Sequence, residues 1–262
     1  PSIAIAISLS FIAGSWFFYD TLWRSPVARR PALASAISIL FVGVVSYALT
    51  KVFSGRAAYI HVGVILGTLM TGNVWFVIVP SQHELVNATL EGREQDAAIS
   101  LRAKERSIHN NYMTFPLLFM MLSNHFPSTY GGKHAWIVLA VIAVGGALVR
   151  HLMNVRFHYQ GWLPVAAFVV AATVGSLFFL TRPPEMPSSA SHPKVAFASV
   201  RPIIERRCQP CHSRTPTDDT WRSPPVGVTF DTPEQIERMA PRIKERAVVL
   251  RTMPLGNKTG IT

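Results

Sequence analysis

Cys208-Gln209-Pro210-Cys211-His212 is the stretch from which the rest of the chain can be interpreted. Its two cysteines are the only ones among 262 residues, and a histidine follows directly behind them. The pattern Cys-x-x-Cys-His is typical of a covalently attached haem c, with two thioether bonds to the porphyrin and the histidine as proximal iron ligand. A zinc site needs about two further ligands at short spacing, and a thioredoxin-like pair needs a βαβ context. The sequence offers neither, so it predicts one haem c held by Cys208, Cys211 and His212.

A haem iron that only transfers electrons usually takes a sixth ligand, and two methionines follow the motif. Met239 lies within 233–246, a charged pattern that predicts a helix beginning at a proline. Met253 lies within 251–257, where proline, glycine and asparagine predict an irregular loop. A loop methionine can fold over the porphyrin face, so Met253 is predicted as the axial partner of His212. The alternative is that Met253 only covers a small core.

The composition indicates membrane spans. Hydrophobic residues make up 49% of the chain, charged residues only 15%, and the mean hydropathy is +0.28. The net charge of +11 does not indicate nucleic acid, because the basic residues lie at the ends of apolar segments and in the haem region. The chain begins inside an apolar segment and stops soon after Met253. We therefore expect the full-length protein to continue at both ends.

The sequence contains six apolar segments, most of which approach the roughly 20 residues that a membrane-spanning helix needs; the fifth is short. Aromatic residues lie at several of their ends, as interface anchors do, and Pro116 in the fourth segment is tolerated in lipid. The sequence thus predicts an all-α fold, a polytopic transmembrane helical bundle followed by a small α-helical cytochrome c domain. The segments are 3–19, 32–50, 59–79, 108–126, 135–149 and 162–180.

The basic residues between the segments predict the orientation in the membrane. The loops after the first, third and fifth segments carry nine Lys or Arg residues, and the loops on the other side carry three. Cytoplasmic loops are the basic ones, so the haem domain is expected on the outer face, in the periplasm of a bacterial inner membrane. The nine are Arg24, Arg29, Arg30, Arg93, Arg102, Lys104, Arg106, Arg150 and Arg156; the three are Lys51, Arg56 and Lys133.

Three regions follow along the chain. The transmembrane domain is predicted over 1–182, with about six spans, and 183–196 reads as an extended linker rich in proline and serine. The cytochrome c domain is predicted over 197–262, without the helix that would close it. Within it, 197–207 places apolar residues at helical spacing, which predicts a helix that leads into Cys208. The apolar face consists of Phe197, Val200, Ile203 and Ile204.

Polar residues in the apolar segments form two candidate clusters, since ionisable groups within spans are costly and often functional. The outer cluster is His61 and His125, with His134 close in sequence, and could hold a second haem or a metal. The inner cluster has the donors and acceptors that a polar, anionic heterocycle needs, with Arg150 as an anion clamp. The alternative for both is that these side chains only cap helix ends. The inner cluster is His83, Glu84, His109, Asn110, Asn111, Tyr112, Arg150, His151 and Asn154.

Two runs within the membrane segments resemble a known family. They are 67–82 (GTLMTGNVWFVIVPSQ) and 109–116 (HNNYMTFP), the latter continuing to 123–127 (SNHFP). Together with the order of membrane helices before the haem motif, they resemble the bacterial membrane-bound urate oxidases (urate hydroxylases) that carry a C-terminal cytochrome c domain. The resemblance extends from about residue 11 onward. Members of that family have additional N-terminal spans and a helix after the methionine loop.

The resemblance implies oxidation of urate to 5-hydroxyisourate, with water as the oxygen source and two electrons passed to the cytochrome. A soluble cytochrome or a terminal oxidase would then accept the electrons. Hydroxylation needs a general base, and His109 or His83 has a suitable ordinary pKa; Tyr112 and Arg150 are the further candidate catalytic residues. Two alternatives remain: a quinol-oxidising or electron-shuttling membrane cytochrome without purine chemistry, and a membrane anchor or purine transporter with the haem as a sensor.

Overall fold

The computed structural model describes residues 2–132, 134–182 and 195–261, and all regular secondary structure in them is helical. The predicted all-α class is therefore confirmed for these residues. The chain divides into two compact units, Pro1–Thr181 and Arg182–Thr262, called here the N-terminal and the C-terminal unit. Lys133 and most of the predicted linker lie outside the described residues.

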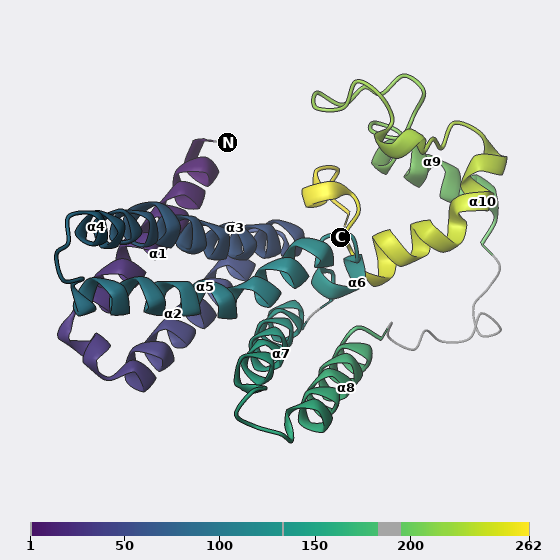
Figure 1. Ribbon diagram of the computed structural model, residues 1–262. Coiled ribbons are helices and arrows are strands. Elements are labelled where there is room, and N and C mark those ends of the chain that lie inside the picture. The colour runs from purple at the N-terminus through teal and green to yellow at the C-terminus, as the bar shows by residue number, and fades with distance from the viewer. Residues whose placement is uncertain (1, 133, 183–194, 262) are drawn as a thin grey trace. The chain divides into compact units, whose positions relative to one another are not determined.

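The N-terminal unit is a bundle of long helices (Figure 1). Five of the six predicted segments coincide with helices that are long and apolar enough to cross a membrane, by length and composition. Such a set is compatible with a multi-pass membrane protein. The helices are α1 (Ser2–Arg24), α2 (Pro31–Val52), α3 (Gly55–Asn73), α4 (Val79–Leu90), α5 (Ala97–Ser123), α6 (Pro127–Tyr130), α7 (Ala135–Val155) and α8 (Trp162–Leu180).

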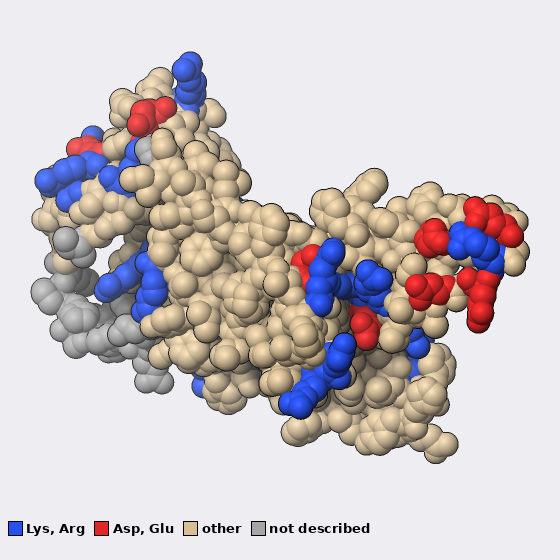
Figure 2. Space-filling model, turned by 90° about the vertical axis from the view of Figure 1, so that its left-hand side faces the viewer, with Lys and Arg blue, Asp and Glu red and all other residues tan. Residues whose placement is uncertain are grey.

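Helix α3 lies at the centre of the apolar core. Its buried side chains pack with those of α7 and α5, and α1 and α2 also contact it. By contrast, α8 is almost wholly apolar yet exposes Phe168 at 72% and Phe178 at 58%. Apolar surface of this extent indicates contact with lipid or with other apolar helices rather than with water. Uncharged side chains make up most of the surface that is visible in Figure 2.

The fourth predicted segment, 108–126, belongs to a longer and more polar helix. Helix α5 begins eleven residues earlier, where Asp96 accepts hydrogen bonds from the backbone N–H groups of Ala98 and Ile99. Its N-terminal half carries several charges, so α5 does not belong to the five helices that qualify as spans. It packs between α3 and α7 instead. Gly146 of α7 lies so close to Pro116 that a Cβ atom there would stand 3.1 Å from the proline nitrogen.

Helices α3 and α4 are continuous through one wide π-helical turn, Val74–Ile78. Pro80 follows this turn and has no N–H group to donate to the carbonyl four residues earlier. The chain widens there, and the backbone N–H of Val79 bonds to the carbonyl of Val74, five residues back. Single π-helical turns in long helices are frequent at functional sites. This one begins directly after Asn73, a fully buried polar residue.

The C-terminal unit has a small core between α9 (Phe197–Arg207) and α10 (Pro233–Ile243). The predicted helix before Cys208 is present with the expected bounds. Phe197, Val200 and Ile204 face the core, but Ile203 is 53% exposed and does not join the predicted apolar face. The remaining elements are the 3-10 turns Pro26–Arg29, Pro225–Gly227 and Leu255–Asn257 and the π-helical turn Lys244–Val249.

Candidate functional site

The Cys-x-x-Cys-His motif folds into one compact turn after α9. The backbone N–H of His212 donates to the carbonyl of Cys208 at 2.9 Å, and that of Cys211 donates to the same carbonyl at 3.2 Å. Both cysteines are half-buried free thiols, and Cys208 packs against the small core. Burial, followed by the proximity of Cys211, raises the pKa of the Cys208 thiol. Burial, followed by the nearby carboxylate of Asp218, raises the pKa of Cys211.

The imidazole of His212 is oriented as an iron ligand requires. Its Nδ1 lies 3.0 Å from the carbonyl oxygen of Val228. A carbonyl oxygen only accepts, so Nδ1 carries the proton and the lone pair is on Nε2. The ring also contacts Phe230, with centroids 5.2 Å apart. A fixed tautomer, two thiols on one turn and an apolar surrounding together fit a covalent haem c.

The two methionines after the motif lie in different surroundings. Met239 packs against the small core of the C-terminal unit. Met253 is 38% exposed and lies outside regular helix, with its backbone N–H bonded to the carbonyl of Arg246 at 3.1 Å. Of the two, only Met253 has a thioether that is free of the core. The sequence-based choice of Met253 as second axial ligand stays a prediction that this placement favours.

An ion-pair cluster joins the segment after Met253 to the loop that follows the haem motif. Lys258 Nζ lies 2.7 Å from a carboxylate oxygen of Asp218 and also contacts Asp219. The hydrogen bond from Lys258 lowers the pKa of Asp218 to about 2. Thr259 Oγ1 adds a hydrogen bond to the carbonyl of Arg207. Residues on both sides of the motif are thus tied to the chain that follows Met253.

In the N-terminal unit, the predicted inner cluster is divided between two faces of α5. His109 and Asn110 point toward α1 and α3, where Asn110 accepts from Asn73 Nδ2 at 2.8 Å and donates to the carbonyl of Met70 at 3.0 Å. His109 Nδ1 lies 2.7 Å from the Tyr19 hydroxyl. The ring of Trp23 lies over His109, with centroids 4.0 Å apart. We call this side of α5 the α1 face.

Four polar residues outside the predicted inner cluster complete the α1 face: Tyr19, Asp20, Asn73 and Arg106. Arg106 donates to Asn73 Oδ1 at 3.3 Å and to Asp20 Oδ1 at 2.9 Å, and its guanidinium lies over the Tyr19 ring. Arg106 is 2% exposed, so it is not the loop cation that the sequence predicts. One signal was present: Asp20 is the only acidic residue before Glu84, and it ends an apolar segment.

The other side of α5, here called the α7 face, carries a second set of contacts. Arg150 Nε donates to Asn111 Oδ1 at 2.6 Å, and the Tyr112 hydroxyl lies 2.8 Å from Nδ1 of His151. A hollow of about 460 Å³ adjoins them. Five of the six residues that line it have polar side chains, and one of these is a cation: Lys104, Ser107, Ile108, Asn111, Tyr112 and Asn154.

Two predicted members of the inner cluster lie apart from both faces. His83 is exposed on α4. Glu84 accepts from Arg93 at 3.2 Å, and both side chains are largely exposed. Hydrogen bonds to Glu91 and Glu84 raise the pKa of Arg93. These contacts close the turn between α4 and α5 and do not reach His109 or Tyr112.

The predicted outer histidines differ in their surroundings. His61 donates through Nδ1 to the carbonyl of Ala57 at 2.7 Å, and its Nε2 lies 2.6 Å from the Ser8 hydroxyl. Both ring nitrogens are therefore engaged. His125 and His134 are exposed. Among the residues that the structure describes, no group of three or more His, Cys, Asp or Glu side chains could hold a metal ion.

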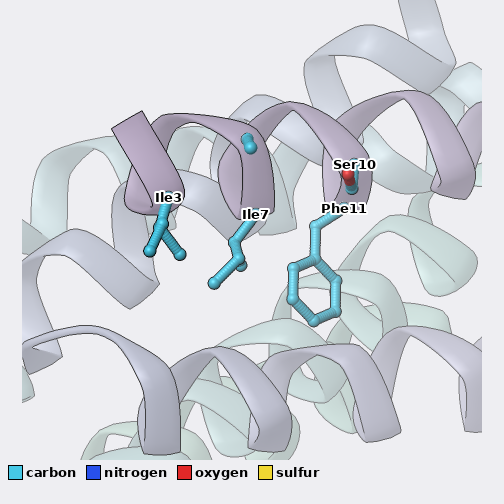
Figure 3. A pocket seen from close by; sticks show the side chains of 5 residues that line it. Ile3, Ile7, Ser10 and Phe11 are labelled. Carbon is cyan, nitrogen blue, oxygen red and sulfur yellow. The ribbon is translucent and has the colours of Figure 1, made fainter. Parts of the chain in front are cut away.

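One further hollow, also about 460 Å³, lies on α1 (Figure 3). Ile3, Ile7 and Phe11 project from one face of the helix, and Ser10 supplies the only hydroxyl. This lining has no charged group, so it does not suit an anionic heterocycle. The α7 face is the better candidate for such a ligand.

A comparison with protein-family models matches residues 1–181 to the family described as Urate oxidase N-terminal. The match covers the whole N-terminal unit, including both faces of α5. A comparison with curated proteins finds no match, and a comparison with solved structures finds none either.

Proposed function

The chain belongs to the urate oxidase N-terminal family, and from this premise we propose that it is a membrane-bound oxidoreductase that oxidises urate to 5-hydroxyisourate. The electrons pass to a haem c held by Cys208, Cys211 and His212. The family match carries the urate assignment. The His212 tautomer and the two thiols on one turn support the haem.

The substrates and products of this reaction determine which groups the protein must bind or accept. Urate and one water give 5-hydroxyisourate, two protons and two electrons. A bound haem c would accept these electrons one at a time, in two sequential transfers. The chain itself must bind an anionic heterocycle, place a water against it and accept the protons.

We assign urate to the hollow on the α7 face. Lys104 supplies a positive charge, and Asn111 and Asn154 supply amide donors and acceptors for a heterocycle edge. Asn111 in turn holds Arg150, whose guanidinium suits a planar anion. Tyr112 lines the same hollow, and its hydrogen bond to His151 offers a path for a proton away from the ligand. His83 is exposed on α4 and does not line the hollow, so it is not included.

The predicted location follows from the same set of features. Five apolar helices suit a multi-pass protein of a bacterial inner membrane. The placement of the haem domain in the periplasm counts the apolar half of α5, 108–126, as a sixth crossing, with the basic loops on the cytoplasmic side. A soluble cytochrome or a terminal oxidase would then accept electrons outside the membrane.

The test is reduction of the haem by urate. Purified membranes with the full-length protein, matured in a host that assembles haem c, should show a rise in reduced-haem absorbance when urate is added. Cys211→Ala, which removes one thioether, is the control for the chromophore. Reduction by quinol and not by urate would support the quinol-oxidising alternative. Reduction by neither would support an anchor or transporter.

A pyridine haemochrome spectrum of the same protein counts the cofactors. One haem c and no other haem is the expected result, since His61 already uses both ring nitrogens. A haem b signal that His61→Ala removes would instead establish the second haem that the outer histidines suggest.

A further inference from the structure

The side chains of the α1 face form a chain of hydrogen bonds in which each group donates to the next. They link Arg106 of α5, Asn73 of α3, Tyr19 of α1 and His109 of α5, in that order. The first three side chains are 2%, 0% and 6% exposed, so water does not compete for their polar atoms. In such surroundings each donor needs an acceptor, and the identity of one group constrains the next.

The orientation of the Asn73 amide is fixed from two sides. Arg106 has donors and no acceptor, so the atom that faces it at 3.3 Å is the amide oxygen of Asn73. Asn110 donates its amide nitrogen to the carbonyl of Met70, so its own oxygen faces Asn73 and needs a donor. Both neighbours require the Asn73 nitrogen to point toward Asn110 and Tyr19. Asp20 holds the Arg106 guanidinium in place from the far side.

This orientation decides where the Tyr19 proton goes. Asn73 Nδ2 donates to the Tyr19 oxygen at 3.0 Å, so the hydroxyl proton must find another acceptor. Among the described residues the only acceptor bonded to that hydroxyl is Nδ1 of His109, at 2.7 Å. The reverse arrangement, with His109 donating to Tyr19, would leave a buried O–H without a partner, which is costly.

We propose that Tyr19 is a positioning residue that keeps the His109 proton on Nε2, so that His109 meets a ligand as a hydrogen-bond donor and not as a base. His109 is partly exposed, and its Nε2 has no hydrogen-bond partner among the described residues. An N–H at this position suits an acceptor oxygen of a ligand on the α1 face. The hollow assigned to urate lies on the α7 face, so the position of the proton does not depend on the proposed function.

With its proton on Nε2, His109 does not act as the general base that the sequence predicts. A base needs an available lone pair that faces the substrate, and the only lone pair of the neutral His109 ring is on Nδ1, where it accepts the hydrogen bond from Tyr19. Proton acceptance falls instead to the Tyr112–His151 pair on the α7 face. Within the part of the chain that the structure describes, no third polar group bonds to this pair and sets the direction of its hydrogen bond.

The test is the tautomer of His109 in the full-length protein. Nitrogen NMR of histidine-labelled protein in bilayers, with the His109 signal identified by its loss in His109→Gln, should show a protonated Nε2 and an unprotonated Nδ1. In Tyr19→Phe the signal should become a mixture of both tautomers. Tyr112→Phe is the matched control: it removes an equivalent hydroxyl and should move the His151 signal while His109 stays unchanged. A protonated Nδ1 in the unsubstituted protein, or an unaltered His109 signal in Tyr19→Phe, would overturn the proposal.

A second variant covers the case in which Tyr19→Phe does not fold. In Asn73→Asp the carboxylate accepts from Tyr19, so the tyrosine can no longer donate to His109. The His109 proton should then move to Nδ1, and retention on Nε2 would contradict the proposed chain. Urate added to the unsubstituted protein should leave the His109 signal unchanged, because the hollow assigned to urate lies on the α7 face; a shift of the Nε2 proton signal would overturn that assignment. If urate fails to reduce the haem while the tautomer is as stated, the proposed function fails and the positioning role stands.

Discussion

The two faces of α5 each carry a tyrosine hydrogen bonded to Nδ1 of a histidine, at 2.7 Å for Tyr19–His109 and 2.8 Å for Tyr112–His151. The lengths are nearly equal, but the surroundings are not. Tyr19 is buried and accepts a further bond from Asn73, whereas Tyr112 and His151 lie at an exposed edge beside a hollow. The distance between a tyrosine oxygen and a histidine nitrogen therefore does not determine which of the two atoms carries the proton. That is determined by the third hydrogen-bonding partner and by how deeply it is buried.

The largest effect should come from removing the charge that balances Arg106. Asp20→Asn leaves a cation that is 2% exposed without its carboxylate. Loss of one partner of a buried ion pair costs about 3–5 kcal/mol. We expect a loss of this size in the free energy of unfolding, measured by denaturant titration in detergent. The α7 face should keep its hollow, because Arg150 does not depend on Asp20.

The matched control is the exposed pair Arg93–Glu84. Glu84→Gln removes a bond of 3.2 Å between largely exposed side chains, and such pairs are worth about 0–1 kcal/mol. Equal losses for Asp20→Asn and Glu84→Gln would show that burial of the α1 face does not strengthen its ion pair.

The next effect concerns the close approach of α1 to α3 beside Asn73. A Cβ atom at Gly72 would overlap the ring of Trp16. Gly72→Ala should push α1 outward and weaken the Tyr19–Asn73 bond, at an overpacking cost of about 1–3 kcal/mol. The same measurement of unfolding, together with the His109 nitrogen signal, checks it.

Gly67, on the same helix, supplies the control. A Cβ atom there meets nothing within 4 Å. Gly67→Ala should therefore leave His109 unchanged and stabilise the helix by up to about 1 kcal/mol, since alanine has the higher helix propensity. A larger loss for Gly67→Ala than for Gly72→Ala would contradict the packing described for Trp16.

The two units differ in how much of their structure could be predicted from the sequence. The haem motif, the helix before it and the irregular segment around Met253 follow from local spacing alone, because each depends on residues close together in the chain. Five of the six predicted apolar segments likewise coincide with helices long and apolar enough to cross a membrane. The length of α5 and the burial of its charged side chains were harder to predict. Its charged first half resembles a loop, so Arg106 was counted among loop cations although it is buried.

The division of the inner cluster had a partial signal in the sequence. Successive helical residues are rotated by about 100°, so four residues from His109 to Tyr112 cannot all face one ligand. Which neighbours each face meets depends on α1 and α7, 39 or more residues away along the chain. His83 was grouped with them because it ends an apolar segment, but α4 continues past it and leaves it exposed. Contacts between helices that are far apart in the chain cannot be predicted from the local spacing of apolar residues.

A moderate effect is expected on the α7 face. Arg150→Met removes the hydrogen bond to Asn111, which lines the hollow, and the guanidinium that is proposed to bind the anion. Loss of a charged hydrogen bond weakens binding by about 1.5–3 kcal/mol, or roughly ten-fold or more in affinity. We expect the KM for urate to rise by that factor in haem-reduction assays, with the His109 tautomer unchanged. Arg156→Gln, an exposed arginine at the end of the same helix, should leave the KM unaltered. A rise in both variants would point to general charge attraction and not to the hollow.

The smallest effect is expected in the C-terminal unit, where the ion pair between Lys258 and Asp218 lies at the surface and not in a buried cluster. Lys258 lowers the pKa of Asp218 from its ordinary 3.8 to about 2. A carboxyl whose folded-state pKa is depressed contributes stability above its unfolded pKa and loses it as pH falls through the folded value. The tie between Lys258 and Asp218 should therefore hold at neutral pH and weaken between about pH 4 and pH 2. Exchange rates of the backbone amide of Met253 should rise over that window, and Lys258→Met should show the same fast exchange already at neutral pH. An amide that exchanges equally fast in both proteins would mean that the ion pair does not order the methionine segment, in which case Thr259 and Arg207 alone hold it.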